Sequence, residues 1–203
     1  MYVTRSRQSR RISSIPLKNP TDNPAAYAAP KTGGLWREIA AELERTHPMH
    51  RLLQGDVGSG KTMVALRAML QAVDSGGQAV LLAPTEILAT QHHRGLVRTL
   101  GDLATAGRLA GGVEIRLLTG SMTQAQRQKV LLDTLTGEVD ILVGTHALLQ
   151  DTVEFDDLAL VVIDEQHRFG VEQRDALRAK ADPPPHLLVM TATPIPRTVA
   201  MTV

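Results

Sequence analysis

Short apolar runs alternate along this chain with longer segments that mix apolar and polar residues. The runs are rich in Leu, Val and Ile and end at glycine, proline, threonine or carboxylate residues, which is typical of buried strands. Six of them lie near residues 49–54, 78–84, 113–120, 140–145, 158–165 and 186–193. Because these runs are apolar throughout, both faces of the sheet that they form are predicted to be covered.

Helical periodicity fills the segments between these runs. In residues 35–46, Leu35, Ile39 and Leu43 recur at intervals of four, which places them on one face of a helix. Further helices are predicted at residues 61–73, 86–100, 123–135 and 172–180, with Thr123 as an N-cap. Strands that alternate with helices predict a doubly wound α/β fold with a mainly parallel sheet and helices on both faces. Ligands of such folds bind beyond the carboxyl ends of the strands.

Residues 1–34 do not follow this pattern. They are rich in proline, and their first 18 residues contain five basic side chains and no acidic one. We expect a largely disordered basic tail over residues 1–34 and a folded domain over residues 35–203. An organelle transit peptide is an alternative interpretation of the tail, whereas a secretory signal is excluded because no apolar segment follows the arginines.

Composition narrows the class of protein further. At 203 residues, with 43% hydrophobic content, the chain is long enough for one well-buried domain. The absence of cysteine excludes disulfides and thiolate metal sites, and no apolar run is long enough for a membrane span. We therefore expect a cytoplasmic protein. The chain has only 2% aromatic residues, so stacking of nucleic-acid bases on aromatic side chains is not expected.

The strongest chemical motif follows the first predicted strand. The segment GDVGSGKT fits the phosphate-binding loop and comprises Gly55, Asp56, Val57, Gly58, Ser59, Gly60, Lys61 and Thr62. Its glycines allow successive backbone amides to converge on phosphate oxygens, at the positive end of the following helix. Lys61 is then expected to reach the β- and γ-phosphates of ATP, and the Thr62 hydroxyl to bind Mg²⁺. A glycine-rich turn without a ligand is the alternative.

Two carboxylates end the fifth predicted strand. Asp164 and Glu165 follow the apolar residues LVVI. Successive residues of a strand point to opposite faces, so the two carboxylates can take different roles. We predict that Asp164 binds Mg²⁺ opposite Thr62, and that Glu165 orients and deprotonates the attacking water. The alternative is that both residues only cap the next helix.

Six segments together carry a family resemblance. In order they are GDVGSGKT, APTEILATQH, LLTGS, GTHALLQ, DEQHRFGVEQR and TATPIPRT. They resemble the first motor domain of superfamily 2 DNA helicases, and within these the ATP-dependent branch-migration helicases. The resemblance covers about residues 49–203 and implies a RecA-like P-loop NTPase domain with a DEQH box. A transcription-repair coupling translocase is an alternative, but Ser59 and Gln166 stand where that group usually has an aromatic residue and a glutamate.

The resemblance also implies roles for further residues. ATP and Mg²⁺ are the implied cofactors, with Lys61, Asp164 and Glu165 as the catalytic residues. The resemblance implies that four residues couple the state of the bound nucleotide to the DNA-binding groove: Gln166, His167, Thr191 and Thr193. Those implied to line the DNA path are Thr85, Glu86, Gln91, Thr119, Gly120, Thr145 and His146. Such side chains and amides contact phosphates without reading bases, so branched or single-stranded DNA is the expected partner.

Parts of the family's architecture are not recognisable in these 203 residues. The wedge domain that splits branched DNA and the second motor domain with its arginine finger have no counterpart here. An arginine finger contributes roughly 10³ to 10⁵ in rate to enzymes that use one. We therefore expect the chain alone to bind ATP and to hydrolyse it slowly. The helicase to which it would belong is expected to act in replication fork reversal and Holliday junction branch migration. A stand-alone nucleotide- or DNA-binding module is the alternative.

Overall fold

The computed structural model describes residues 30–45, 47–56, 58–106, 111–164 and 171–192. The predictions made for the tail up to residue 29 and for Val57, Glu165, Gln166, His167 and Thr193 lie outside these ranges. The elements are α1 (Pro30–Leu43), β1 (His50–Gln54), α2 (Lys61–Asp74), β2 (Gln78–Leu82), α3 (Glu86–Leu100), α4 (Asp102–Thr105), β3 (Ile115–Leu118), α5 (Gln124–Leu135), β4 (Ile141–Gly144), the 3₁₀ helix η3 (His146–Leu149), β5 (Leu158–Asp164), α6 (Val171–Arg178) and β6 (His186–Thr191).

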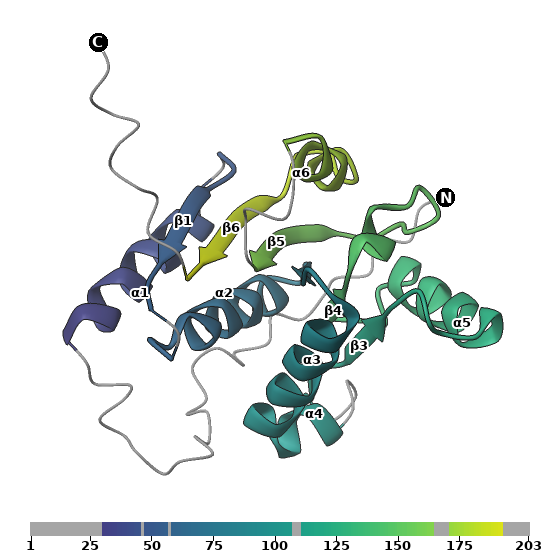
Figure 1. Cartoon of the computed structure of the whole chain (residues 1–203). Helices are drawn as coiled ribbons and strands as arrows, with labels where there is room; N and C mark the ends of the chain where they lie inside the picture. The colour runs from purple at the N-terminus through teal and green to yellow at the C-terminus, as the bar shows by residue number, and fades with distance from the viewer. Residues whose placement is uncertain (1–29, 46, 57, 107–110, 165–170, 193–203) are drawn as a thin grey trace.

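The six strands form one parallel sheet in the order β1-β6-β5-β2-β4-β3 (Figure 1). This arrangement confirms the predicted α/β class and the parallel sheet. All strands run in the same direction, so their carboxyl ends meet at one edge of the sheet. The segments that follow β1, β2, β3, β4 and β5 therefore start at that edge.

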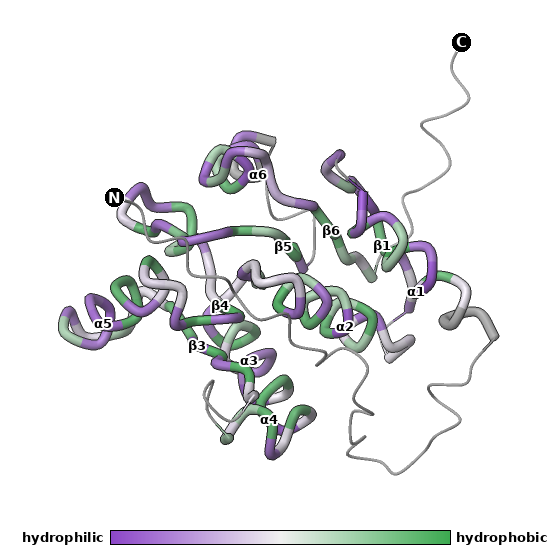
Figure 2. The backbone as a smooth tube through the Cα atoms, turned by 180° about the vertical axis from the view of Figure 1, so that it is seen from behind, coloured by the Kyte–Doolittle hydropathy of each residue, from purple (hydrophilic) through white to green (hydrophobic). Residues whose placement is uncertain are grey.

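Two hydrophobic cores lie on the two faces of the sheet. In β5, Leu160 and Val162 pack with buried residues of α1, α2 and α3, while Val161 and Ile163 pack with those of α5, η3 and α6. This division follows the alternation of side chains along a strand. Figure 2 shows the apolar residues concentrated in the strands and in α2, which crosses the middle of the sheet in Figure 1. None of the described helices is long and apolar enough to pass through a bilayer.

Helix α1 is attached to the rest of the domain by apolar packing and by an arginine of β1. Ile39 is fully buried in the core under α1. From β1, Arg51 donates Nε and Nη2 to the two carboxylate oxygens of Glu42, each at 2.9 Å, and Nη1 to Glu38 at 2.8 Å. This forked pairing holds the pKa of Glu42 below its ordinary value. The helix is thus held to β1 by charge and to the core by packing.

Beyond shifts of a few residues at element ends, the structure differs from the prediction at α1, α4 and η3. Helix α1 begins at Pro30 rather than Leu35, which a proline in the first helical turn allows because its missing N–H would have no acceptor there. Neither the short α4 nor η3 was predicted; α4 follows the predicted helix 86–100, and η3 follows the predicted strand 140–145. A Cβ on Gly144 would collide with the Leu118 carbonyl and with Leu148 of η3, so glycine is required where the chain turns.

Candidate functional site

The loop between β1 and α2 has the backbone geometry of a phosphate cradle. Gly58 and Gly60 have φ angles of 82° and 84°, in the left-handed region that residues with a Cβ rarely adopt. Gly60 is also the N-cap of α2, and its carbonyl accepts from the Met63 and Val64 amides at 3.0 and 3.2 Å. The loop therefore leads directly into a helix N-terminus, where unpaired amides and the helix dipole favour an anion.

Lys61 lies folded over this loop. Its ammonium donates to the carbonyl oxygens of Gly55, at 2.5 Å, and Asp56, at 2.8 Å. A Cβ on Gly55 would lie 2.8 Å from the Ser59 hydroxyl, so the loop closes tightly on itself. The positive charge is thus held at the mouth of the cradle, and the donor set fits the phosphates of a nucleotide.

Strand β6 joins the loop to the acidic end of β5. Gly55 donates its amide to the Thr191 carbonyl at 3.3 Å, and Gln54 is the register partner of Thr191. On the other side of β6, Met190 is the register partner of Asp164. Asp164 therefore lies at the same edge of the sheet as the loop, two strand spacings or about 10 Å away. Thr191, a predicted coupling residue, is buried between them.

Asp164 has a partner that the sequence analysis did not assign. His92 Nε2 lies 2.7 Å from Asp164 Oδ2, and both side chains are 15% exposed. His92 comes from α3, where it lies three residues after Ala89 and four before Leu96, both buried. A histidine on the buried stripe of the predicted helix 86–100 is the signal that could have identified it.

The oxygen ligands at this site, Thr62 and Asp164, suit Mg²⁺. They are too few for a metal ion that is held by protein side chains alone. Among the described residues there is no group of three or more His, Cys, Asp or Glu side chains that could hold an ion. Thr62 is exposed at the start of α2, and Asp164 is partly buried at the end of β5. Mg²⁺ is typically bound by one or two protein oxygens together with substrate phosphates and water.

The residues predicted to line the DNA path divide into two groups. Thr85, Gln91, Gly120 and His146 are exposed after the carboxyl ends of the strands or in the helices that follow them. Thr119 and Thr145 are instead buried, at 4% and 1% exposure. The Thr145 hydroxyl has no hydrogen-bond partner among the described residues. The seventh residue, Glu86, is half-buried, so the exposed group presents the most surface to a ligand.

Hydrogen bonds tie the loops of this edge together. Thr85 caps α3 by accepting from the Leu88 amide at 3.3 Å. The next residue, Glu86, accepts from the Ser121 amide at 3.2 Å and the Ser121 hydroxyl at 2.6 Å. The Ser121 hydroxyl is the main cause that holds the pKa of Glu86 below its ordinary value. Glu86 thus connects α3 to the loop after β3.

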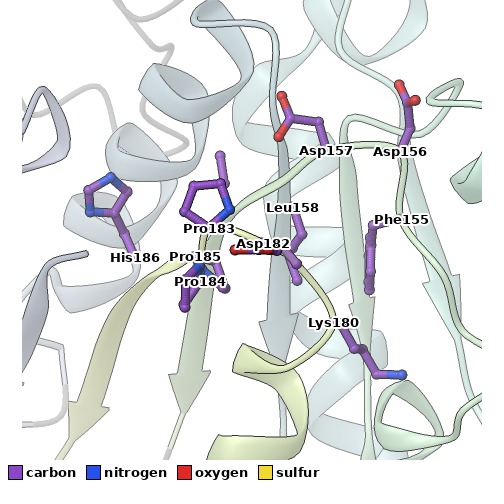
Figure 3. Close-up of a pocket in the computed structure, with 12 residues that line it drawn as sticks. Phe155, Asp156, Asp157, Leu158, Lys180, Asp182, Pro183, Pro184, Pro185 and His186 are labelled. Carbon is purple, nitrogen blue, oxygen red and sulfur yellow. The ribbon is translucent and has the colours of Figure 1, made fainter. Parts of the chain in front are cut away.

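A separate cavity of about 380 Å³ lies at the amino-terminal ends of the strands, where β5 and β6 begin (Figure 3). This end of the sheet is opposite to the one that carries the phosphate loop. Figure 3 shows Phe155, Lys180 and His186 around it, and its further lining includes Asp156, Asp157, Asp182 and Pro183 to Pro185. The Lys180 ammonium is bound to the carbonyls of Gln150 and Val153, at 2.8 and 3.0 Å. Because the phosphate loop follows the carboxyl end of β1, this cavity is not part of the nucleotide site.

The phosphate loop, the carboxylate at the end of β5 and the parallel sheet define a P-loop nucleotide-binding domain. Residues 37–202 match the DEAD/DEAH box helicase family, and the chain belongs to that family. It is similar to the ATP-dependent DNA helicase RecG of Mycobacterium leprae, with 60% identity over 173 residues, 82% of this chain and 23% of that protein. RecG of Haemophilus influenzae is 47% identical over 205 residues, covering 96% of this chain and 28% of the relative.

Solved structures show the same relationship. A RecG bound to a three-way DNA junction superimposes with a TM-score of 0.68 at 38% identity, covering 94% of this chain and 23% of that one. The DEAD-box helicase Mss116, bound to single-stranded RNA, has a TM-score of 0.61 at 16% identity and supports the fold alone. The chain spans about a quarter of the length of the curated relatives it matches.

Proposed function

We propose that this chain is the ATP-binding motor domain of a RecG-like DNA helicase that acts on branched DNA in recombination and repair. The observation that carries the proposal is the loop itself. Two left-handed glycines precede α2, and Lys61, its first residue, is folded over the loop, in a chain of the helicase family. The strand register also places Asp164 at the same edge of the sheet.

Each residue of the site has a distinct task in this proposal. The amides of the loop and the first turn of α2 bind the phosphates, and Lys61 exchanges its bonds to Gly55 and Asp56 for phosphate oxygens. Thr62 and Asp164 would hold Mg²⁺, which would neutralise the charge of the phosphates when bound. Glu165, the next residue after Asp164, orients the water that attacks the terminal phosphate.

DNA is proposed to bind at the same edge of the sheet through its sugar-phosphate backbone. Thr85, Gln91, Gly120 and His146 are exposed there and offer hydroxyl, amide and imidazole groups. Contacts of this kind position a nucleic acid without reading its sequence. A helicase that moves along DNA requires this, because it must accept every sequence that it meets.

Full motor activity is proposed to need a second motor domain. The family resemblance implies that an arginine from that domain completes the ATP site, and a wedge domain is implied for splitting branched DNA. The curated relatives are about four times as long as the matched segment, which leaves room for both domains in proteins of this kind. The 203 residues alone are then a nucleotide-binding unit with slow hydrolysis.

Nucleotide binding by a Lys61→Ala variant tests the proposal. The substitution removes the ammonium at the mouth of the cradle, so affinity for a fluorescent, non-hydrolysable ATP analogue with Mg²⁺ should fall at least about tenfold, or about 1.4 kcal/mol. Fluorescence titration of the purified chain measures this. Lys129→Ala is the matched control, because Lys129 lies on α5 and pairs with Asp133 at 3.0 Å.

The control variant should bind the analogue as the unmodified chain does. Equal affinity of the Lys61→Ala variant and the unmodified chain would show that the loop is not the nucleotide site, and the proposed function would fall. Loss of binding in both variants would point to a general loss of folding, which a thermal melt of each protein detects independently.

A further inference from the structure

The contact between His92 and Asp164 joins two elements that are far apart in sequence. Asp164 is the last residue of β5, and His92 lies on α3, 72 positions earlier. A carboxylate offers only acceptors, so Nε2 of the imidazole carries the hydrogen in this 2.7 Å bond. The bond occupies Oδ2 of Asp164 and leaves Oδ1 for another partner.

Both ends of this bond are held in place. Asp164 follows Leu160 and Val162 on the face of the sheet that α1, α2 and α3 cover. His92 lies between Ala89 and Leu96, which are 0% and 1% exposed and anchor α3 in the same core. The imidazole is therefore carried by a helix that is anchored in the core, so its position relative to the carboxylate is defined.

We propose that His92 is the positioning residue of the metal-binding carboxylate: it holds Asp164 through Oδ2, leaves Oδ1 for the metal, and connects α3 to the Mg²⁺ site. The inference rests on the proposed function, because it needs Asp164 to bind the metal of a metal–nucleotide complex. Residues that orient a metal ligand typically change metal affinity about 10- to 100-fold when they are replaced.

The place of His92 on α3 gives the bond a second consequence. Gln91, the preceding residue, is exposed and is a candidate DNA contact, while His92 points into the protein. The start of α3 is fixed by the Thr85 cap and by the bonds of Glu86 to Ser121. A shift of α3 on DNA binding would therefore move the group that holds Asp164, and binding of metal–nucleotide and DNA would be linked reciprocally.

The test compares two amide substitutions that differ in reach. The amide of His92→Gln extends about as far as Nε2 and can still donate to Asp164, whereas the shorter amide of His92→Asn cannot. The probe is Mn²⁺, whose electron paramagnetic resonance signal reports binding directly, with a non-hydrolysable ATP analogue. The measured quantity is the ratio of nucleotide affinity with Mn²⁺ to nucleotide affinity in EDTA.

We expect His92→Asn to lower this ratio about tenfold and His92→Gln to stay within about twofold of the unmodified chain. His93→Gln is the matched control, because His93 is the neighbouring residue and its Nε2 lies 3.4 Å from the Ile115 carbonyl. A loss of stability there leaves Asp164 untouched, so the ratio should not change even if the melting temperature falls.

Three outcomes would overturn the inference. One is a ratio in His92→Asn equal to that of the unmodified chain. Another is an equal loss of affinity with and without Mn²⁺, accompanied by a lower melting temperature, which would show a purely structural role. The third is a nucleotide affinity that does not depend on Lys61, in which case the proposed function fails and the inference fails with it.

Discussion

Gln78 uses both ends of its side-chain amide inside the protein. It is 3% exposed, and its Nε2 donates to the carbonyls of Thr134 and Val139 at 2.9 and 2.7 Å. Its Oε1 accepts from the amides of Asp156 and Asp157 at 2.8 and 3.2 Å. One side chain thus bonds backbone groups from the end of α5 and from the segments before β4 and β5.

Gln78→Leu should therefore destabilise the protein without leaving a large cavity. Leucine fills a similar volume but makes none of these four bonds, two of which are buried, at a cost of about 2–4 kcal/mol in the free energy of unfolding. Urea denaturation followed by circular dichroism measures the change. Gln124→Ala, at the exposed start of α5, is the control and should change stability by less than about 0.5 kcal/mol. A cost below that value for Gln78→Leu would show that water replaces the amide.

Some features of single residues could be predicted from the sequence, and others could not. The need for glycine at positions 58 and 60 was predictable, because a phosphate loop dictates backbone angles locally, and the structure has both in the left-handed region. The contact of His92 with Asp164 was not, since it depends on how α3 lies on the sheet. The burial of Thr145 was missed for the same reason, since a motif position does not tell which way a side chain points.

At the scale of elements, β1 and β6 begin together at a histidine. The Met49 amide donates to His186 Nδ1 at 2.8 Å, and the Leu187 amide donates to the Met49 carbonyl at 2.7 Å. The first bond requires an unprotonated Nδ1. Burial lowers the pKa of His186, although Asp182 lines the same cavity. The start of this strand pair is therefore sensitive to acid.

Lowering the pH from 7.5 to 5.5 should destabilise the protein in part through His186. Below the ordinary histidine pKa of about 6.5, the unfolded chain takes up a proton that the folded state resists, so stability is complete above that pH and falls below it. One proton changes the free energy of unfolding by at most about 1.4 kcal/mol per pH unit. His186→Asn keeps an acceptor but does not titrate, so its loss of stability should be smaller.

Urea denaturation at the two pH values, followed by the fluorescence of Trp36, measures the difference. Some acid sensitivity should remain in His186→Asn, because burial also lowers the pKa of His93. If the variant and the unmodified chain lost the same stability between pH 7.5 and 5.5, the bond between Met49 and His186 would not be the acid-sensitive contact.

The elements themselves were largely predictable because their signals are local. Helix α3 occupies the predicted residues 86–100, and Thr123 caps α5 in a box in which Thr123 and Gln126 each bond the other's backbone. The order of the strands was not predicted, because it depends on pairings between distant segments. Only the structure places β6 between β1 and β5.

For the molecule as a whole, the expected rate of ATP hydrolysis depends on the proposed second motor domain, which the 203 residues do not include. We expect the purified 203-residue chain to hydrolyse ATP at a rate close to that of its Lys61→Ala variant, with little change when branched DNA is added. The reason is that an arginine from another domain typically supplies roughly 10³ to 10⁵ of the rate. A coupled assay of phosphate release measures turnover. Strong stimulation by branched DNA that depends on Lys61 would show that these residues build a complete site.

The position of β6 also has a consequence for how the protein is made. The phosphate loop leaves the ribosome before β6 does, yet β1 is an outer strand of the described sheet and pairs with β6, whose residues are synthesised about 137 positions later. Contacts of such long sequence separation form slowly during folding. Until β6 is inserted, β1 has no strand to pair with and β5 exposes an apolar edge, which is prone to aggregation. A nascent chain of this domain would therefore carry a recognisable ATP-binding motif well before it could bind ATP.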